Sequence, residues 1–214
     1  MLLNHRRALR FAGAALAAAG LLFLLVAVPA TRDGVQAVDD RFQRFMVSVR
    51  TPALVRAAEA LALIGGVWVT WTLRAVAVVA LVVRRRWMQL GAFALAGITS
   101  EALLGPLKSL YARPRPPDGL LATDTFSFPS GHALAGAVTA VGIVVVLMAP
   151  GSRRWRWEIR AAVLASSIAL SRTYLSVHWL SDVLAGGLLG IALAIGWPAL
   201  LQGVRERSLH TSSA

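Results

Sequence analysis

The chain of 214 residues carries 57% hydrophobic and only 15% charged residues, so most of its surface must face something other than water. Its formal net charge of +12 would suit a nucleic-acid-binding protein, but the arginines fall in short clusters between apolar runs, a pattern that indicates membrane topology and no nucleic-acid partner. The absence of cysteine excludes disulfides, thiolate metal ligands and a cysteine nucleophile.

Six segments are apolar enough to be membrane-spanning helices, each of which needs roughly 20 residues. They lie near residues 9–30, 57–83, 87–107, 129–149, 159–175 and 179–201. The fifth is the weakest of the six, because it is short and its outer end is polar. The predicted fold is therefore all-α, a polytopic membrane protein with six transmembrane helices in one domain over residues 1–214.

The first segment has an alternative interpretation as a cleavable signal peptide, because "VPA" precedes Thr31 and a basic stretch precedes the apolar run. The run from Phe11 to Val28 is long for a signal peptide, which favours a retained helix. No catalytic prediction depends on this choice.

Clusters of basic residues alternate with the apolar segments and predict the orientation of the chain. They are "HRRALR" at the start, "RRR" at 84–86, "RRWRWEIR" at 153–160 and "RER" near the end. The positive-inside rule places these clusters and both termini in the cytoplasm. The connections around 31–56, 108–128 and 174–179 then lie on the outer side of the membrane.

The first outer connection contains apolar residues at helical spacing, and they predict an amphipathic helix on the membrane surface that could cover a site. These residues are Val35, Val38, Phe42, Phe45, Met46 and Val49. A solvated connector is the alternative that the pattern leaves open.

Three isolated charges fall within the apolar segments, namely Arg74, Glu59 and Glu101. Ionisable groups inside a membrane need a partner or a function. We expect structural pairing, such as Arg74 with an acid on a neighbouring helix, and assign these residues no catalytic role.

The remaining charges of interest gather at the outer ends of the later segments, and they are Lys108, Arg113, Arg115, His132, Arg172, His178 and Asp182. Lys108, Arg115 and Arg172 would supply three fixed positive charges, and guanidinium groups suit oxyanions. The predicted pocket therefore binds an anion such as phosphate.

The stretch "FPSGHALAG", residues 128–136, has the features of a helix start. Free amides in the first turn of a helix bind phosphate, Gly131 lets the backbone come close, and the Ser130 hydroxyl could add a donor. An ordinary capped helix is the alternative, but His132 follows directly, where it could reach an atom attached to a bound phosphate.

His178 and Asp182 are four residues apart, so on a helix they share a face. A carboxylate that accepts from one ring nitrogen leaves the other nitrogen free as a nucleophile or base. A purely structural pair is the alternative. A zinc site from two histidines and an aspartate is disfavoured, because three nearby cations would repel a divalent metal.

Three motifs together resemble the signature of the type 2 phosphatidic acid phosphatase superfamily. They are "KSLYARPRP" from Lys108, "PSGH" at 129–132 and "SRTYLSVHWLSD" at 171–182, in the family's order and with its internal spacings. The signature covers residues 108–182, and the six-segment layout extends the likeness to nearly the whole chain. The short chain without added domains is typical of a bacterial member.

The resemblance implies a metal-independent lipid phosphatase in the cytoplasmic membrane, with no cofactor and an active site on the outer face. By matching position His178 is the nucleophile, Asp182 orients it and His132 protonates the leaving oxygen. The phosphoryl group is held by Lys108, Arg115, Ser130, Gly131 and Arg172. The implied substrates are polyprenyl diphosphates such as undecaprenyl pyrophosphate, which we favour, and phosphatidylglycerol phosphate, phosphatidic acid or diacylglycerol pyrophosphate. A lipid phosphotransferase and a non-enzymatic transporter or scaffold are the alternatives.

Overall fold

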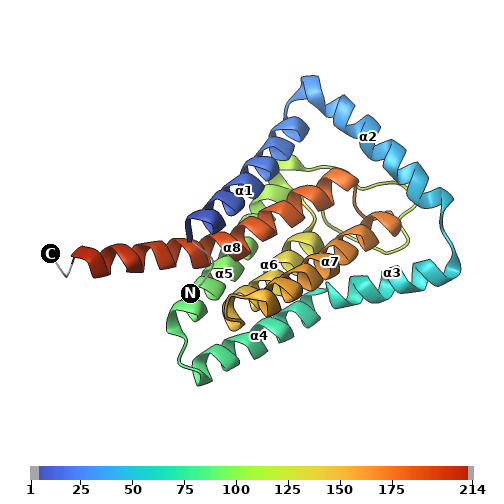
Figure 1. The fold of residues 1–214 in the computed structure, drawn as a ribbon. Helices are drawn as coiled ribbons and strands as arrows, with labels where there is room; N and C mark the ends of the chain where they lie inside the picture. Colours follow the sequence, from blue (N-terminus) through green and yellow to red (C-terminus); the bar gives the residue numbers. More distant parts are fainter. Residues whose placement is uncertain (1–4, 212–214) are drawn as a thin grey trace.

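The computed structural model describes residues 5–211 and contains helices but no strands over that range. The helices pack into a bundle, and α2 runs across one end of it between α1 and α3 (Figure 1). Their bounds are α1 His5–Ala27, α2 Pro29–Ser48, α3 Pro52–Ile64, α4 Val67–Val83, α5 Trp87–Tyr111, α6 Gly131–Leu147, α7 Ser152–Tyr174 and α8 Leu180–Thr211.

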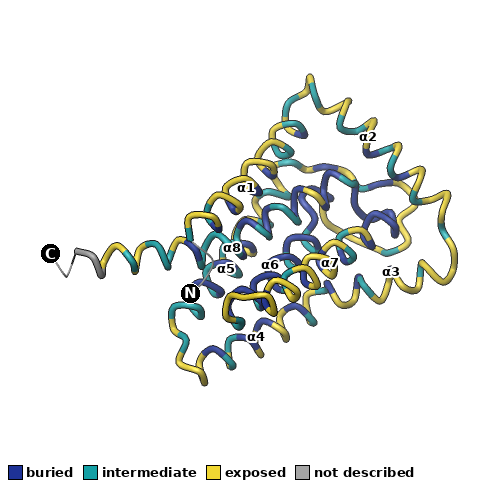
Figure 2. Tube along the Cα trace, viewed as in Figure 1, coloured by how far each residue is buried: buried dark blue, intermediate teal, exposed yellow. Residues whose placement is uncertain are grey.

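Helix α6 is the central element of the bundle and packs against α4, α5, α7 and α8. Its sequence "GHALAGAVTAVGIVVVL" is apolar around the whole helix, as expected for a helix that neighbours surround. Leu134 and Val138 of α6 form a core cluster with Leu189 of α8. Figure 2 shows the resulting contrast between the buried centre and the exposed outer helices.

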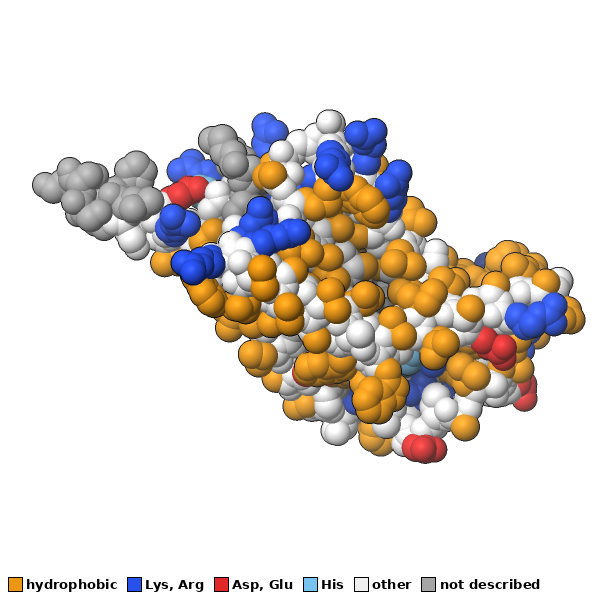
Figure 3. Space-filling view, turned by 90° about the horizontal axis from the view of Figure 1, so that it is seen from below, with side chains coloured by type: hydrophobic (Ala, Val, Ile, Leu, Met, Phe, Trp, Pro, Cys, Tyr) orange, Lys and Arg blue, Asp and Glu red, His pale blue; other side chains and the backbone are white. Residues whose placement is uncertain are grey.

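Large apolar side chains cover the outside of the bundle, as a lipid environment requires. Trp68 is 87% exposed and Leu110 is 76% exposed, and hydrophobic side chains extend over the middle of the face in Figure 3. An apolar surface of this kind is unfavourable in water and favourable against lipid tails. The chain is therefore an integral membrane protein.

Over residues 5–211 three helices are long and apolar enough to cross a membrane, α1, α5 and α8, and the pair α3–α4 would make a fourth span. Helix α6 is apolar but has only 17 residues. The first half of α7 carries several arginines. The arrangement of six spans with both termini in the cytoplasm therefore stays a prediction.

The structure differs from the predicted segments in where the helices bend, begin and end. The predicted segment 57–83 is two helices, α3 and α4, bent by 45° at Gly65 and Gly66. Helix α7 already begins at Ser152, before the predicted 159, and α8 continues past 201. Arginine has high helix propensity, so a helix continues into a charged run that a hydropathy criterion excludes.

The prediction of a helix in the first outer connection is confirmed, because α2 covers residues 29–48, and its place on the membrane surface stays a prediction. Its orientation is unexpected. Val38 is 60% exposed and Phe45 is 56% exposed, whereas Asp39 and Gln43 are buried against the bundle. Two polar residues of α2 thus face the protein, whereas the outward side carries apolar residues together with charged ones such as Asp33 and Arg41.

The beginning of α1 and the end of α8 meet at the end of the bundle opposite α2. His5 forms an ion pair of 2.9 Å with Glu206, and Figure 1 shows the start of α1 and the last part of α8 on this side. The opposite end holds the C-termini of α5 and α7 and the N-termini of α6 and α8, which brings the three sequence motifs together.

Glycine is required where α8 crosses the first turn of α6. A Cβ at Gly186 would lie 2.4 Å from the carbonyl oxygen of Ser130, whereas a Cβ at Gly187 would meet no atom within 4 Å. The backbone amide of Ser130 also donates to the Asp182 carbonyl at 3.0 Å. The close approach of α8 therefore connects the second motif to the third.

We expect Gly186→Ala to destabilise the protein by about 1–3 kcal/mol, because the added methyl group collides with backbone that cannot move aside cheaply. Gly187→Ala is the matched control, and its gain in helix propensity should leave stability unchanged or raise it by about 0.5–1 kcal/mol. Thermal unfolding of the two purified variants in detergent measures the difference. Equal melting temperatures would contradict this account of the helix crossing.

Candidate active site

A cavity of about 310 Å³ opens where the ends of α5, α6 and α7 meet the connection before α8. Six of the predicted site residues line it, Lys108, Arg115, Gly131, His132, Arg172 and His178. The other two, Ser130 and Asp182, are fully buried behind this layer. The structure thus places both imidazoles and three cations on one cavity.

Lys108 and Arg115 are held at the cavity wall by the loop that follows α5. The helix ends at Tyr111, and the chain then turns through Ala112, whose φ is 42°. The Lys108 ammonium donates to the carbonyl of Phe126. Arg115 donates to the carbonyls of Thr125 at 2.7 Å and Val177 at 2.5 Å. The carbonyl groups of the loop therefore orient both cations.

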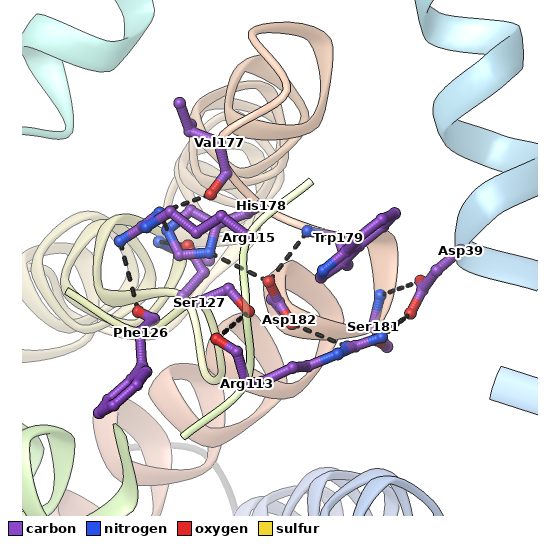
Figure 4. Close-up of polar contacts among 12 residues, drawn as sticks. Asp39, Arg113, Arg115, Phe126, Ser127, Val177, His178, Trp179, Ser181 and Asp182 are labelled. Carbon is purple, nitrogen blue, oxygen red and sulfur yellow. Dashed lines mark hydrogen bonds and ion pairs between the residues drawn. The ribbon is translucent and has the colours of Figure 1, made fainter. Parts of the chain in front are cut away.

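His178 lies between α7 and α8, where Asp182 and Arg115 contact its two ring nitrogens (Figure 4). Nδ1 is 3.2 Å from the Asp182 carboxylate, and Nε2 is 3.2 Å from Arg115 Nη1. A guanidinium group can only donate, so Nε2 must be the acceptor and Nδ1 must carry the proton. This tautomer puts the lone pair on Nε2, at the cavity wall, where it accepts from Arg115.

Burial lowers the pKa of His178 from 6.5 to about 4, because an imidazolium loses hydration, and the hydrogen bond to Asp182 opposes this shift without cancelling it. Burial also lowers the pKa of Arg115, which the Asp182 charge partly offsets. His178 is therefore neutral at pH 7, the protonation state that a nitrogen nucleophile requires.

The "PSGH" motif forms the start of α6 as predicted, with Ser130 as the N-cap residue. The Ser130 hydroxyl accepts from the Ala133 amide at 3.5 Å. Gly131 and His132 follow in the first turn and line the cavity. The positive end of the helix dipole thus faces the cavity beside a histidine.

Arg172 occupies the last turn of α7 and is 4% exposed. Its backbone carbonyl accepts from the amides of Val177 and His178 at 3.1 and 3.3 Å. Its buried side-chain Nε has no hydrogen-bond partner among the described residues. A buried guanidinium N–H without an acceptor is costly, so this group is suited to an anion in the cavity.

The three isolated charges, Arg74, Glu59 and Glu101, have different surroundings in the structure. Arg74 of α4 pairs with Glu101 of α5 at 2.7 Å, as expected, and also donates to Thr139 of α6 at 2.9 Å. Glu59 is exposed on α3. Glu101 also lines the cavity, a placement that the sequence does not reveal.

The sequence analysis did not predict that Arg113 pairs with Asp39 and with Asp182. Arg113 donates to Asp182 at 2.9 Å and to Asp39 at 2.7 Å. The position of Arg113 inside the first motif is a signal, but nothing in the sequence links Asp39 to it. Over residues 5–211 no group of three histidine or acidic side chains is arranged to hold a metal ion.

The low pKa of His178 leads to a prediction about how the stability of the folded protein changes in acid. In the unfolded state His178 takes up a proton near pH 6.5, whereas in the native state it does so only near pH 4. The free energy of unfolding is therefore highest above pH 6.5 and decreases as the pH drops from 6.5 to 4. The loss is on the order of 3 kcal/mol. We expect His178→Gln to lose less thermal stability than the unsubstituted protein between pH 7 and pH 4.5, and an equal loss would contradict the prediction.

A sequence model of the PAP2 superfamily matches residues 85–206. Phosphatidylglycerophosphatase B of Bacillus subtilis is 30% identical over 181 residues, which cover 81% of this chain and 88% of that protein. The undecaprenyl-diphosphatase of Sulfolobus acidocaldarius is 43% identical over 65 residues, which cover 30% of this chain and 29% of that protein.

Two crystal structures share the fold. One is a transmembrane PAP2-type phosphatidylglycerolphosphate phosphatase from Bacillus subtilis, with a TM-score of 0.75 and 26% identity, covering 92% of this chain and 96% of the other. The other is LpxE of Aquifex aeolicus, with a TM-score of 0.61 and 24% identity, covering 73% and 92%. Because the family match spans more than half of the 214 residues and agrees with the three motifs, the chain belongs to the PAP2 superfamily.

Proposed function

We propose that this chain hydrolyses a phosphate monoester or diphosphate on a membrane lipid, through a phosphohistidine on His178 and without a metal ion. Membership of the PAP2 superfamily makes it a lipid phosphatase. The proposal adds the residues, the chemical steps, the side of the membrane and the substrate class.

The observation that carries the proposal is the single cavity lined by two imidazoles and three cations. The ammonium of Lys108 and the guanidinium groups of Arg115 and Arg172 would hold the equatorial oxygens of a phosphoryl group, with the amides of the first turn of α6. Such donors stabilise the charge of a phosphoryl-transfer transition state in a site of low dielectric constant. Ser130 supports them as the cap that shapes this turn.

The reaction has two steps. Nε2 of His178 attacks phosphorus as the bond to the leaving oxygen breaks, and His132 donates a proton to that oxygen. Asp182 accepts the Nδ1 hydrogen bond and stabilises the positive charge on the ring. In the second step His132 accepts a proton from water, the water oxygen bonds to phosphorus, and the P–N bond breaks to release inorganic phosphate.

A lipid substrate is supported by what surrounds the cavity. Leu104, Val67 and Trp71 contribute apolar surface to its lining, and the outer faces of α4 and α5 expose large apolar side chains. A phosphate head group would bind at the cations while an acyl or prenyl tail lies against these helices. Polyprenyl diphosphate is the substrate we favour, and phosphatidylglycerol phosphate, phosphatidic acid and diacylglycerol pyrophosphate complete the panel to be assayed.

We expect His178→Ala to lower phosphate release by at least about 1,000-fold, because the nucleophile is lost. The assay measures inorganic phosphate from purified protein with each lipid of the panel, without an acceptor alcohol. His5→Ala is the control, since His5 lies at the other end of the bundle and pairs with Glu206. A His178→Ala protein with near-normal activity, or activity that EDTA abolishes and a divalent metal restores, would refute the mechanism.

The proposal also places the cavity on the outer side of a bacterial cytoplasmic membrane, with six spans and both termini inside. Because the natural chain has no cysteine, single substitutions can be labelled selectively. Ala122→Cys, exposed in the loop over the cavity, should react with a membrane-impermeant maleimide on intact cells. Ser152→Cys, exposed beside the arginines of α7, should react only after permeabilisation, and the reverse pattern would overturn the orientation.

A further inference from the structure

Helix α2 buries a carboxylate against the bundle, although it lies far in sequence from every motif. Asp39 is 1% exposed, while its neighbour Val38 is 60% exposed. A buried charge is strongly unfavourable unless other groups pair with it and satisfy its hydrogen bonds. The partners of Asp39 therefore indicate what this part of α2 does.

Both oxygens of Asp39 are bonded, and their partners flank the proposed nucleophile. Oδ1 accepts from the Ser181 amide at 2.9 Å. Oδ2 accepts from the Ser181 hydroxyl at 2.6 Å and from Arg113 Nη2 at 2.7 Å. Ser181 is adjacent to Asp182 in the first turn of α8, so Asp39 holds the start of the helix that carries Asp182 (Figure 4).

Arg113 connects the carboxylate of α2 to the carboxylate of α8. While Nη2 bonds Asp39, Nη1 donates to Asp182 Oδ1 at 2.9 Å and to the Ser181 hydroxyl at 2.6 Å. Gln36 of α2 accepts a further bond of 2.6 Å, and the guanidinium group lies 5.5 Å from the centre of the Trp179 ring. Partners on several sides therefore restrict Arg113 to one position.

This arrangement determines how Asp182 meets His178. Oδ1 of Asp182 is bonded by Arg113, and Oδ2 accepts from the Trp179 amide at 2.9 Å and faces His178 Nδ1 at 3.2 Å. With both oxygens held, the carboxylate cannot rotate away from the ring. Two carboxylates and one guanidinium also leave one net negative charge, which matches the positive charge that the imidazole acquires when Nε2 bonds to phosphorus.

We infer that Asp39 and Arg113 are positioning residues for His178, which act through Asp182 although neither lines the cavity. The inference rests on the proposed role of His178 as the nucleophile. It makes α2 part of the catalytic architecture. Loss of the Asp39 charge would leave Arg113 free to shift and Asp182 free to rotate.

The kinetic test uses Asp39→Asn, with Asp33→Asn as the matched control because Asp33 is an exposed carboxylate on the same helix. We expect Asp39→Asn to lower kcat about 10- to 100-fold while KM changes by less than about 3-fold, since orientation of the nucleophile is lost and substrate contacts remain. In an Asp182→Asn background, Asp39→Asn should have almost no further effect. Independent, multiplicative losses, or kcat values equal to those of the control, would overturn the inference.

A second measurement does not need turnover. Nitrogen NMR of protein labelled at its four histidines reports the tautomer of His178, assigned with His178→Gln. We expect one tautomer with the proton on Nδ1 in the unsubstituted protein and in Asp33→Asn, and a mixture in Asp39→Asn. An unchanged tautomer would overturn the inference. If the tautomer responds but no lipid phosphate is hydrolysed, the proposed function fails and the positioning network stands.

Ser181→Ala provides a milder variant that keeps every charge, in case Asp39→Asn does not fold. It removes one hydroxyl that bonds both Asp39 and Arg113. We expect a decrease in kcat of about 3- to 10-fold with little change in KM. A kcat equal to that of the Asp33→Asn control would count against the network.

Discussion

The ionised carboxylate of Asp182, fully buried at the end of the bundle, is the group on which the rest of the site depends. In a medium of low dielectric constant an unpaired carboxylate would be protonated or would destabilise the fold. Here it is bonded by a guanidinium, a backbone amide and an imidazole. Because these partners come from separate segments, satisfying one charge requires the loop after α5 and the start of α8 to meet.

The end of the bundle that holds the cavity is built from ordinary helix ends. The last turn of α7 supplies the carbonyl that holds the backbone of His178, and the first turn of α6 supplies free amides beside His132. Helix ends carry unpaired backbone groups in any case. The ends of α5, α6, α7 and α8 lie together at one end of the bundle. Their backbone groups can therefore form a polar cavity while every helix stays intact.

A lipid environment also accounts for features that would be anomalous in a water-soluble protein. Trp68 and Leu110 are largely exposed on the outside of the bundle, and Arg74 is buried in the bundle but paired with Glu101 and Thr139. Lipid tails offer no hydrogen bonds, so charged groups find partners within the protein while apolar groups face out. The buried polar residues of this chain are therefore informative about its function.

The sequence by itself determined the family, the all-helical class and six of the residues that line the cavity, because each depends on local spacing. His178 and Asp182 are only four residues apart, although His178 itself precedes α8, and "PSGH" has the residues of a helix start. The tertiary structure alone decided the 45° bend between α3 and α4, the inward face of α2 and the contact of Arg113 with Asp39 across 74 residues. Such contacts depend on how helices pack in three dimensions, and no periodicity along the chain encodes which distant carboxylate a buried arginine will meet.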